Sequence, residues 1–345
     1  MNQTKQTNDN MKKVIAIVCG GDSSEHGVSM RSADGIYSFL DKERYDCYIV
    51  ELCARKWEVI LSDGERLPVD RNDFSFIVPC SENPDKVQKI IPDFAYITIH
   101  GTPGENGILQ GYFELLRIPY STSGVLVEAL TFHKFVLNNY LRSYGITVAE
   151  SLLVRKGQEN ALSEEEIIGK VGLPCFVKPA DDGSSFGVTK VKTIEELRPA
   201  LEVAFAEDSD VMIEAYLDGT EITCGCYKTN GEVHVLPITE VVTEQEFFDY
   251  DAKYNGKVDE ITPARIDEKT AERVSKLTAA IYEILGCRGI IRIDYILTGT
   301  KGKETINMLE VNTTPGMTAT SFIPQQIRAA GLEPRDVLTD IIEHS

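Results

Sequence analysis

The chain has 345 residues, of which 42% are apolar and 26% charged, and its formal net charge is −19. This length and composition are typical of a globular protein with roughly two or three domains. The negative charge argues against nucleic acid as the main partner, because binding a phosphate backbone requires a basic surface.

The eight cysteines are scattered along the chain. Only Cys224 and Cys226 lie close together, and their CxC spacing lacks both the usual zinc pattern and a paired histidine. We therefore expect reduced, mostly buried thiols, which are typical of the cytosol. The sequence contains no signal peptide and no apolar run of membrane length, so a cytoplasmic location without a membrane partner is expected.

The first part of the chain has the pattern of a doubly wound α/β unit. The apolar run Val14–Cys19 predicts a buried parallel strand, the turn Gly20–Glu25 follows it, and a helix is expected over residues 29–40. Ligands bind at the carboxyl end of such a strand. The turn lacks the GxGxxG spacing of dinucleotide-binding proteins, which disfavours a hydride-transferring enzyme.

A second glycine-rich loop, His100–Gly107, follows a strand expected over residues 94–99. Both loops leave the carboxyl ends of strands, so we predict that Glu25 and His100 face one crevice. A lone histidine is more often structural, but its position at a strand end beside glycines favours a functional role.

A predicted hairpin carries a Gly/Ser-rich loop. Strand Cys175–Pro179 leads into residues 181–187, and strand Val188–Val191 follows. Backbone N–H groups in such loops can hold phosphate oxygens, and Lys178 would supply positive charge. The alternative is an ordinary flexible hairpin turn.

The same loop also matches a hydrolase motif. Residues Gly183–Gly187 fit GxSxG, the nucleophile elbow of serine hydrolases, which requires a strand, a turn and then a helix. Here the β-branched, alternating residues after the loop predict a strand, and neither His234 nor His344 is placed as a base. A hydrolase with Ser185 as nucleophile is therefore disfavoured.

Two further lysines lie in segments suited to a phosphate site. Lys134 lies in a helix expected to run through it to about Ser143, after the small-residue run Ser121–Gly124, which marks a domain boundary. Lys253 lies in the irregular stretch Phe247–Gly256, whose aromatic residues and flanking glycine suggest a lid. The alternative for this stretch is a loop packed by its own aromatic side chains.

Two apolar runs near the C-terminus carry polar side chains on one face. Arg292 and Asp294 alternate in the first run, and Glu310 and Asn312 alternate in the second, where Leu309 is expected to turn toward the core. If the two strands pair, the acids and the amide converge and form an oxygen-only ligand set suited to Mg²⁺ and substrate phosphates. The alternative is an edge strand with solvated polar residues, which the repetition of the pattern on two strands disfavours.

Together these segments fit nucleoside triphosphate chemistry in a cleft between domains. The GxxxxGK[ST] loop is absent, which excludes a Walker-type fold. The HRD and DFG motifs of protein kinases are absent as well.

The chain resembles the D-alanine–D-alanine ligases, a branch of the ATP-grasp superfamily, over about residues 13–342. The resemblance rests on six motifs in the order typical of the family: GGDSSE, IHGTPGENGILQG, VKPADDGSSFGVTKV, EFFDYDAKY, IRIDY and LEVNTTPGMT. It implies an α/β ATP-grasp fold with three domains. These are an N-terminal Rossmann-like substrate-binding domain (1–122), a central ATP-grasp subdomain (123–213) and a C-terminal ATP-grasp subdomain with the lid and metal site (214–345).

The resemblance also implies roles for individual residues. The residues that would position the first D-alanine are Glu25, Ser184 and Tyr254, with His100 close by. Those that would stabilise the transition state and hold the second D-alanine are Arg292, Gly316 and Ser321. Nucleotide contacts would come from Lys134, Lys178, Ser185, Glu214, Tyr216, Leu217, Glu221 and Lys253. The metal ligands would be Asp294, Glu310 and Asn312.

The implied reaction joins two D-alanines, with ATP cleaved to ADP and phosphate, for peptidoglycan precursor synthesis. The family implies Mg²⁺ or Mn²⁺, with two ions, and a homodimer. The nearest alternatives are ligases that make D-alanyl-D-lactate or D-alanyl-D-serine, and Tyr254 resembles the dipeptide-forming type. A non-catalytic nucleotide-binding regulator on the same fold is disfavoured, because a pure binder does not need the full set of acids, amide, arginine and lysines.

Overall fold

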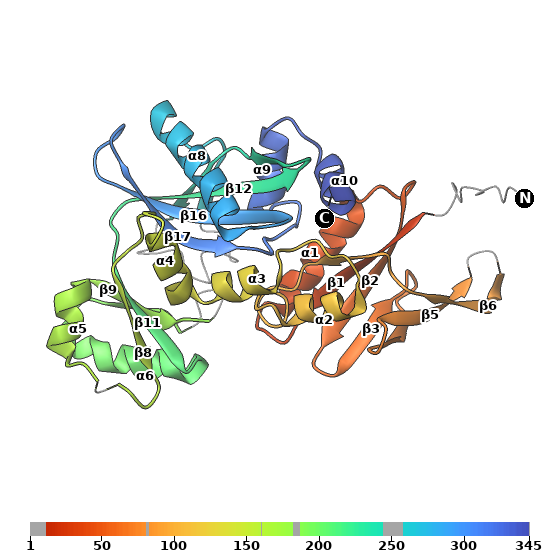
Figure 1. The fold of residues 1–345 in the computed structure, drawn as a ribbon, viewed down its shortest axis with the longest axis horizontal. Helices are drawn as coiled ribbons and strands as arrows, with labels where there is room; N and C mark the ends of the chain where they lie inside the picture. Colours follow the sequence, from red (N-terminus) through yellow and green to blue (C-terminus); the bar gives the residue numbers. More distant parts are fainter. Residues whose placement is uncertain (1–11, 81–82, 160, 182–186, 244–257, 345) are drawn as a thin grey trace, which may run out of the picture.

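The computed structural model describes residues 12–80, 83–159, 161–181, 187–243 and 258–344. These residues form three β-sheets with helices packed on them (Figure 1). Among the described residues, no helix combines the length and apolarity needed to cross a bilayer.

The first sheet has seven strands in the order β6-β5-β4-β3-β2-β1-β7. Its strands are β1 (Lys13–Gly20), β2 (Tyr45–Cys53), β3 (Lys56–Ile60), β4 (Arg66–Asp70), β5 (Ser75–Cys80), β6 (Asn83–Ile90) and β7 (Phe94–Ile97). β1 pairs in parallel with β2 and β7, and α1 (His26–Phe39) and α2 (Ile108–Leu116) follow β1 and β7. The predicted doubly wound opening is confirmed, whereas the antiparallel extension β3–β6 was not predicted.

The second sheet is smaller and antiparallel, in the order β10-β9-β11-β8. Its strands are β8 (Ser151–Arg155), β9 (Cys175–Pro179), β10 (Thr189–Val191) and β11 (Asp210–Ala215). The helices of this part are α5 (Glu164–Val171) and α6 (Leu197–Glu207), the latter preceded by a 3₁₀ turn at Ile194–Glu196. A capping box between Ser163 and Glu166 begins α5 and satisfies two N–H groups at the helix start.

The third sheet has the order β15-β14-β12-β16-β17, and β13 also pairs with β12. Its strands are β12 (Thr220–Thr229), β13 (Glu232–Val235), β14 (Thr239–Thr243), β15 (Val258–Ile261), β16 (Ile290–Thr298) and β17 (Thr305–Asn312). The remaining helices are α3 (Val125–Phe132), α4 (Lys134–Arg142), α8 (Glu268–Leu285), α9 (Phe322–Ala329) and α10 (Pro334–His344).

The C-terminal helices complete the core of the first sheet. The C-terminus lies beside α1 (Figure 1), and one buried apolar cluster includes Ile15 of β1, Ile36 of α1 and Ile341 of α10. The hydroxyl of Tyr45 donates to Glu343 Oε1 at 2.6 Å. The first and last parts of the chain are therefore one packed body.

The segment between the first sheet and α3 packs closely on the entry to β16. Arg288 donates its N–H to Ser123 Oγ at 3.1 Å, and its guanidinium donates to the hydroxyl of Tyr120 at 3.0 Å. At Gly289 a Cβ atom would lie 1.9 Å from the Ser121 carbonyl oxygen. Only a residue without a side chain allows this contact between the two backbones.

The substitution Gly289→Ala is expected to lower the free energy of unfolding by more than about 3 kcal/mol, because it adds backbone overlap to strain at a positive φ. Gly286 is the matched control, since its φ of +69° is close to the +66° of Gly289 but it has no atom within 4 Å of an added Cβ. Gly286→Ala should cost only about 1–2 kcal/mol. Urea unfolding measures both losses, and equal losses would contradict the role given to this backbone contact.

Candidate active site

The antiparallel pair β16–β17 brings the predicted metal ligands together. Arg292 lies opposite Asn312, and Asp294 lies opposite Glu310. Arg292 donates two hydrogen bonds to Asp294, from Nε to Oδ1 at 2.9 Å and from Nη2 to Oδ2 at 2.8 Å. Asp294 is only 5% exposed, so this bidentate pair compensates a nearly buried carboxylate. The four side chains share one end of the strand pair, as their alternation predicts.

One residue of β17 departs from the predicted alternation. Asp294 pairs with Glu310, but its neighbour Tyr295 pairs with Met308, so Leu309 is an extra residue in β17. Leu309 is half-buried, whereas Met308 belongs to the buried core. The expectation that Leu309 turns toward the core was wrong, because a β-bulge inserts one residue and resets the alternation.

The donor set fits a divalent cation. Asn312 Nδ2 lies 3.2 Å from Asp294 Oδ2 and 3.5 Å from Glu310 Oε1, so the amide and both carboxylates are within reach of one another. Among the described residues, no group of three or more His, Cys, Asp and Glu is gathered for a metal, so the amide is needed to complete this set. To ligate an ion, the amide must turn so that Oδ1 replaces Nδ2, and oxygen ligands of this kind suit Mg²⁺ or Mn²⁺.

A cleft of about 490 Å³ lies between residues of the first sheet's loops and residues of the third sheet. Its volume is typical of small-molecule sites. The predicted site residues that line it are Glu25, His100, Arg292, Glu310, Asn312, Gly316 and Ser321. Asp294 does not line the cleft, but it accepts hydrogen bonds from Arg292, which does. Site residues from three distant segments of the chain therefore face a single space.

The two glycine-rich loops of the first sheet are tied together at the cleft. Ser23 Oγ donates to the His100 carbonyl oxygen at 2.8 Å and accepts the Glu25 N–H at 3.2 Å. Ser32 Oγ lies 3.4 Å from His100 Nε2. Glu25 and His100 are 9% and 7% exposed, so both are held in nearly closed surroundings at the cleft wall.

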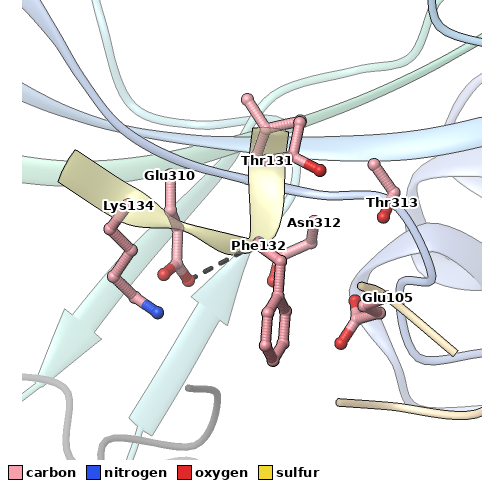
Figure 2. A pocket seen from close by; sticks show the side chains of 8 residues that line it. Glu105, Thr131, Phe132, Lys134, Glu310, Asn312 and Thr313 are labelled. Carbon is pink, nitrogen blue, oxygen red and sulfur yellow. Dashed lines mark hydrogen bonds between the residues drawn. The ribbon is translucent and has the colours of Figure 1, made fainter. Parts of the chain in front are cut away.

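A smaller cavity lies beside the metal-ligand candidates and includes Lys134 (Figure 2). Figure 2 shows the Lys134 ammonium on the same side of this cavity as the Glu310 carboxylate, with Glu105 on the opposite side. The backbone N–H of Lys134 donates to the Ala180 carbonyl at 3.0 Å, which ties the start of α4 to the end of β9. A cation and an acid side by side in one cavity are suited to a polyphosphate with its metal.

Glu105 was not singled out from the sequence, although it lies in the second glycine-rich loop. It lines both cavities and accepts the Gly101 N–H at Oε2, at 2.7 Å. Burial raises the pKa of Glu105, the charge of Glu25 raises it further, and His100 opposes the shift. In the sequence, the feature that could have pointed to Glu105 was its position in the same glycine-rich loop as His100.

Two of the predicted nucleotide contacts form a buried ion pair. Lys178 Nζ lies 2.6 Å from Glu214 Oε2, and their side chains are 11% and 4% exposed. Asn138 Nδ2 donates to the other oxygen of Glu214 at 3.1 Å. The structure thus brings Lys178 and Glu214 together on β9 and β11, and neither lines the cleft or the smaller cavity.

The remaining predicted nucleotide contacts lie just after β11 and on β12. The ring of Tyr216 has Lys190 Nζ at 3.9 Å from its centroid, and Leu217 is half-buried next to it in the chain. Glu221 lies opposite Ile296 of β16. None of the three lines the cleft or the smaller cavity among the described residues.

Four predicted site residues lie outside the described residues: Ser184, Ser185, Lys253 and Tyr254. The strand that follows the Gly/Ser-rich loop is present, because β10 pairs antiparallel with β9. A strand at this position contradicts a serine-hydrolase elbow, which continues into a helix.

Family models account for most of the chain. The model of the D-ala D-ala ligase N-terminus matches residues 14–123, and that of the D-ala D-ala ligase C-terminus matches residues 140–343. The chain belongs to the D-alanine–D-alanine ligase family.

Relatives within the D-alanine–D-alanine ligase family match nearly the full length. The D-alanine–D-alanine ligase of Phocaeicola vulgatus is 66% identical over 334 residues, which are 97% of this chain and 99% of the relative. That of Bacteroides fragilis strain YCH46 is 64% identical with the same coverage.

Solved structures of D-alanine ligases share the fold. The VanG D-Ala:D-Ser ligase from Enterococcus faecalis is 29% identical, with a TM-score of 0.82 over 96% of this chain and 99% of that one. The D-alanine–D-alanine ligase from Bacillus anthracis, complexed with ATP, is 31% identical, with a TM-score of 0.73 over 96% and 97%. The predicted ATP-grasp fold is therefore confirmed, whereas the boundaries of the three domains and the residue roles stay predictions.

Proposed function

We propose that this chain is an ATP-dependent ligase that joins two D-alanines into D-alanyl-D-alanine. The observation that carries the proposal is the cleft in which Arg292, Glu310 and Asn312 of the third sheet face Glu25 and His100 of the first. Identity of 66% to a D-alanine–D-alanine ligase supports the same reaction.

The first step activates a carboxylate, which is a poor electrophile. The carboxylate oxygen of the first D-alanine attacks the γ-phosphorus of ATP, the bond to the β-phosphate oxygen breaks, and ADP leaves an acyl phosphate behind. Asp294, Glu310 and Asn312 would hold two Mg²⁺ or Mn²⁺ ions, whose chemistry is to neutralise charge on the phosphates. Glu25 faces the cleft, where a carboxylate suits the ammonium group of that D-alanine.

The second step forms the peptide bond. The neutral amine of the second D-alanine attacks the acyl carbon and forms the C–N bond. The tetrahedral intermediate then breaks its C–O bond to phosphate, which leaves together with the proton lost by the nitrogen. Arg292 lines the cleft and would stabilise the oxyanion, together with the N–H of Gly316. Ser321 would bind the carboxylate of the second D-alanine. Exclusion of water is required, because acyl phosphates hydrolyse readily, and we assign that task to the stretch that carries Lys253 and Tyr254.

The same resemblance supports three wider proposals. The product serves peptidoglycan precursor synthesis, the protein works in the cytoplasm, and it forms a homodimer. Lys134 contributes to nucleotide binding from the smaller cavity, and Lys178 does so once its pairing with Glu214 is exchanged for phosphate.

The second substrate decides between this ligase and its nearest alternatives. A ligase for D-serine has the same fold as this chain, whereas the relatives above 60% identity are named D-alanine–D-alanine ligases. Phosphate release should be observed with ATP, Mg²⁺ and D-alanine alone, and mass spectrometry should identify D-alanyl-D-alanine. Turnover only after addition of D-serine or D-lactate would favour the alternatives, and no turnover with any of these substrates would favour a non-catalytic binder.

A further inference from the structure

A buried acid lies directly behind the loop that leaves β17. Glu128 of α3 has no exposed surface, and it accepts a hydrogen bond from the hydroxyl of Thr313. Thr313 follows the predicted metal ligand Asn312 in the chain and is itself only 3% exposed. A side chain from the segment after the first sheet thus contacts the side chain of the residue that follows Asn312.

The loop has other anchors, which come from α1 and from the loop that follows β7. Thr314 Oγ1 donates to the Ile99 carbonyl oxygen at 3.4 Å, and the Met317 N–H donates to Ser32 Oγ at 3.3 Å. Thr314 is also a hydrogen-bond partner of the Glu105 side chain. The contact of Glu128 with Thr313 is the one nearest in sequence to Asn312.

Burial of the Glu128 carboxyl group costs free energy of folding, because its oxygens lose their hydrogen bonds to water. A glutamate is almost never fully buried without partners, and the Glu128 carboxyl group has the Thr313 hydroxyl, with the Thr122 side chain and the Ser123 backbone also beside it. Burial raises the pKa of Glu128 well above its usual range, and its hydrogen bond with Thr313 opposes that shift. The hydrogen bond to Thr313 is the contact through which this carboxyl group reaches the loop.

We propose that Glu128 is a positioning residue for the metal site. By accepting the Thr313 hydroxyl, it fixes the backbone just after Asn312 and so orients the Asn312 amide toward Asp294 and Glu310. Such a contact outside the ligand set tunes metal affinity by holding a ligand in its binding orientation. The inference rests on the proposed function, which requires the cation that these residues would hold.

The test compares metal binding among paired variants. Thr313→Val and Glu128→Leu remove the hydrogen bond, whereas Thr313→Ser and Glu128→Gln keep a hydroxyl donor and an oxygen acceptor. Free Mn²⁺ measured by electron paramagnetic resonance, in the presence of ADP, gives the dissociation constant of each protein without turnover. The first two variants should bind Mn²⁺ about 10- to 100-fold more weakly, and the second two should keep most of the affinity.

Thr229→Val is the matched control. Thr229 is also buried and its hydroxyl lies 3.3 Å from a side-chain nitrogen, that of His234, far along β12 from the metal ligands. It should bind Mn²⁺ like the parent protein. If Glu128→Leu fails to fold, Thr313→Val decides alone.

Two results would overturn the proposal: a Thr313→Val protein that binds Mn²⁺ as tightly as the parent, or a Thr313→Ser protein that binds as weakly as Thr313→Val. A parent protein that binds Mn²⁺ but forms no D-alanyl-D-alanine would instead contradict the proposed function. The two failures are therefore distinguishable.

Discussion

Glu310→Gln is expected to lower kcat for D-alanyl-D-alanine formation by about 1,000-fold or more, equivalent to roughly 4 kcal/mol of transition-state stabilisation. Glutamine keeps the size of the side chain but removes the negative charge that lies opposite Asp294 and lines the same cavity as Lys134. Phosphate release at saturating ATP and D-alanine, over a range of Mg²⁺ concentrations, measures the effect.

The control for this variant makes the same chemical change on the surface. Glu272 of α8 has a side chain that is 64% exposed and a salt bridge of 3.8 Å to Lys276, so Glu272→Gln should leave kcat unchanged. The assignment of Glu310 as a metal ligand is wrong if Glu310→Gln keeps the metal dependence and rate of the parent protein.

Arg292→Lys should lower kcat by about 100- to 1,000-fold, because removal of one donor to a developing oxyanion typically has this effect. Lysine keeps the charge but cannot reproduce the two parallel hydrogen bonds that Arg292 makes to Asp294. Asp294 would then be a nearly buried carboxylate with a poorer partner, so its orientation toward Asn312 and Glu310 should also change. Single-turnover measurement of ATP cleavage to ADP reports the first step, and release of phosphate with the dipeptide reports the second.

Arg265→Lys is the matched control for the loss of a bidentate pair. Arg265 also donates two hydrogen bonds to one carboxylate, that of Glu240, at 2.8 and 2.9 Å, but its side chain is 62% exposed. Its replacement should alter neither step, since exposed ion pairs contribute little. Equal rates for Arg292→Lys and the parent would show that the fork to Asp294 is unnecessary for turnover.

The sequence carried most of the information about the strands that bear the site. Short apolar runs such as Val14–Cys19 favour a buried parallel strand, because a strand buried on both faces has a continuous apolar pattern. Alternation placed Arg292 with Asp294 and Glu310 with Asn312, and the pairing of β16 with β17 brought both sets to one end. Periodicity of two is a local property, so it can be determined without knowledge of the fold.

Other features depend on contacts that no local pattern contains. The strand β6 has the residues NPDKVQKI, which are poor in β-formers, and it becomes a strand through its pairing with β5. The bulge at Leu309 depends on the register against β16. Glu128 follows three apolar residues in a short helix, and its burial results from a partner, Thr313, that is 185 positions away. Tertiary contacts of this kind decide burial, and the sequence alone does not show them.

The joining of both chain ends into one apolar cluster has a consequence for synthesis on the ribosome. Ile341 and Glu343 contact the first sheet, and β17, which ends at Asn312, leaves the ribosome long after that sheet. The first sheet is made early but can complete its packing only once α10 has been made, because that helix covers it. Domains generally fold as units during synthesis, but here the cleft can form only after β17 has been made, when these long-range contacts can close.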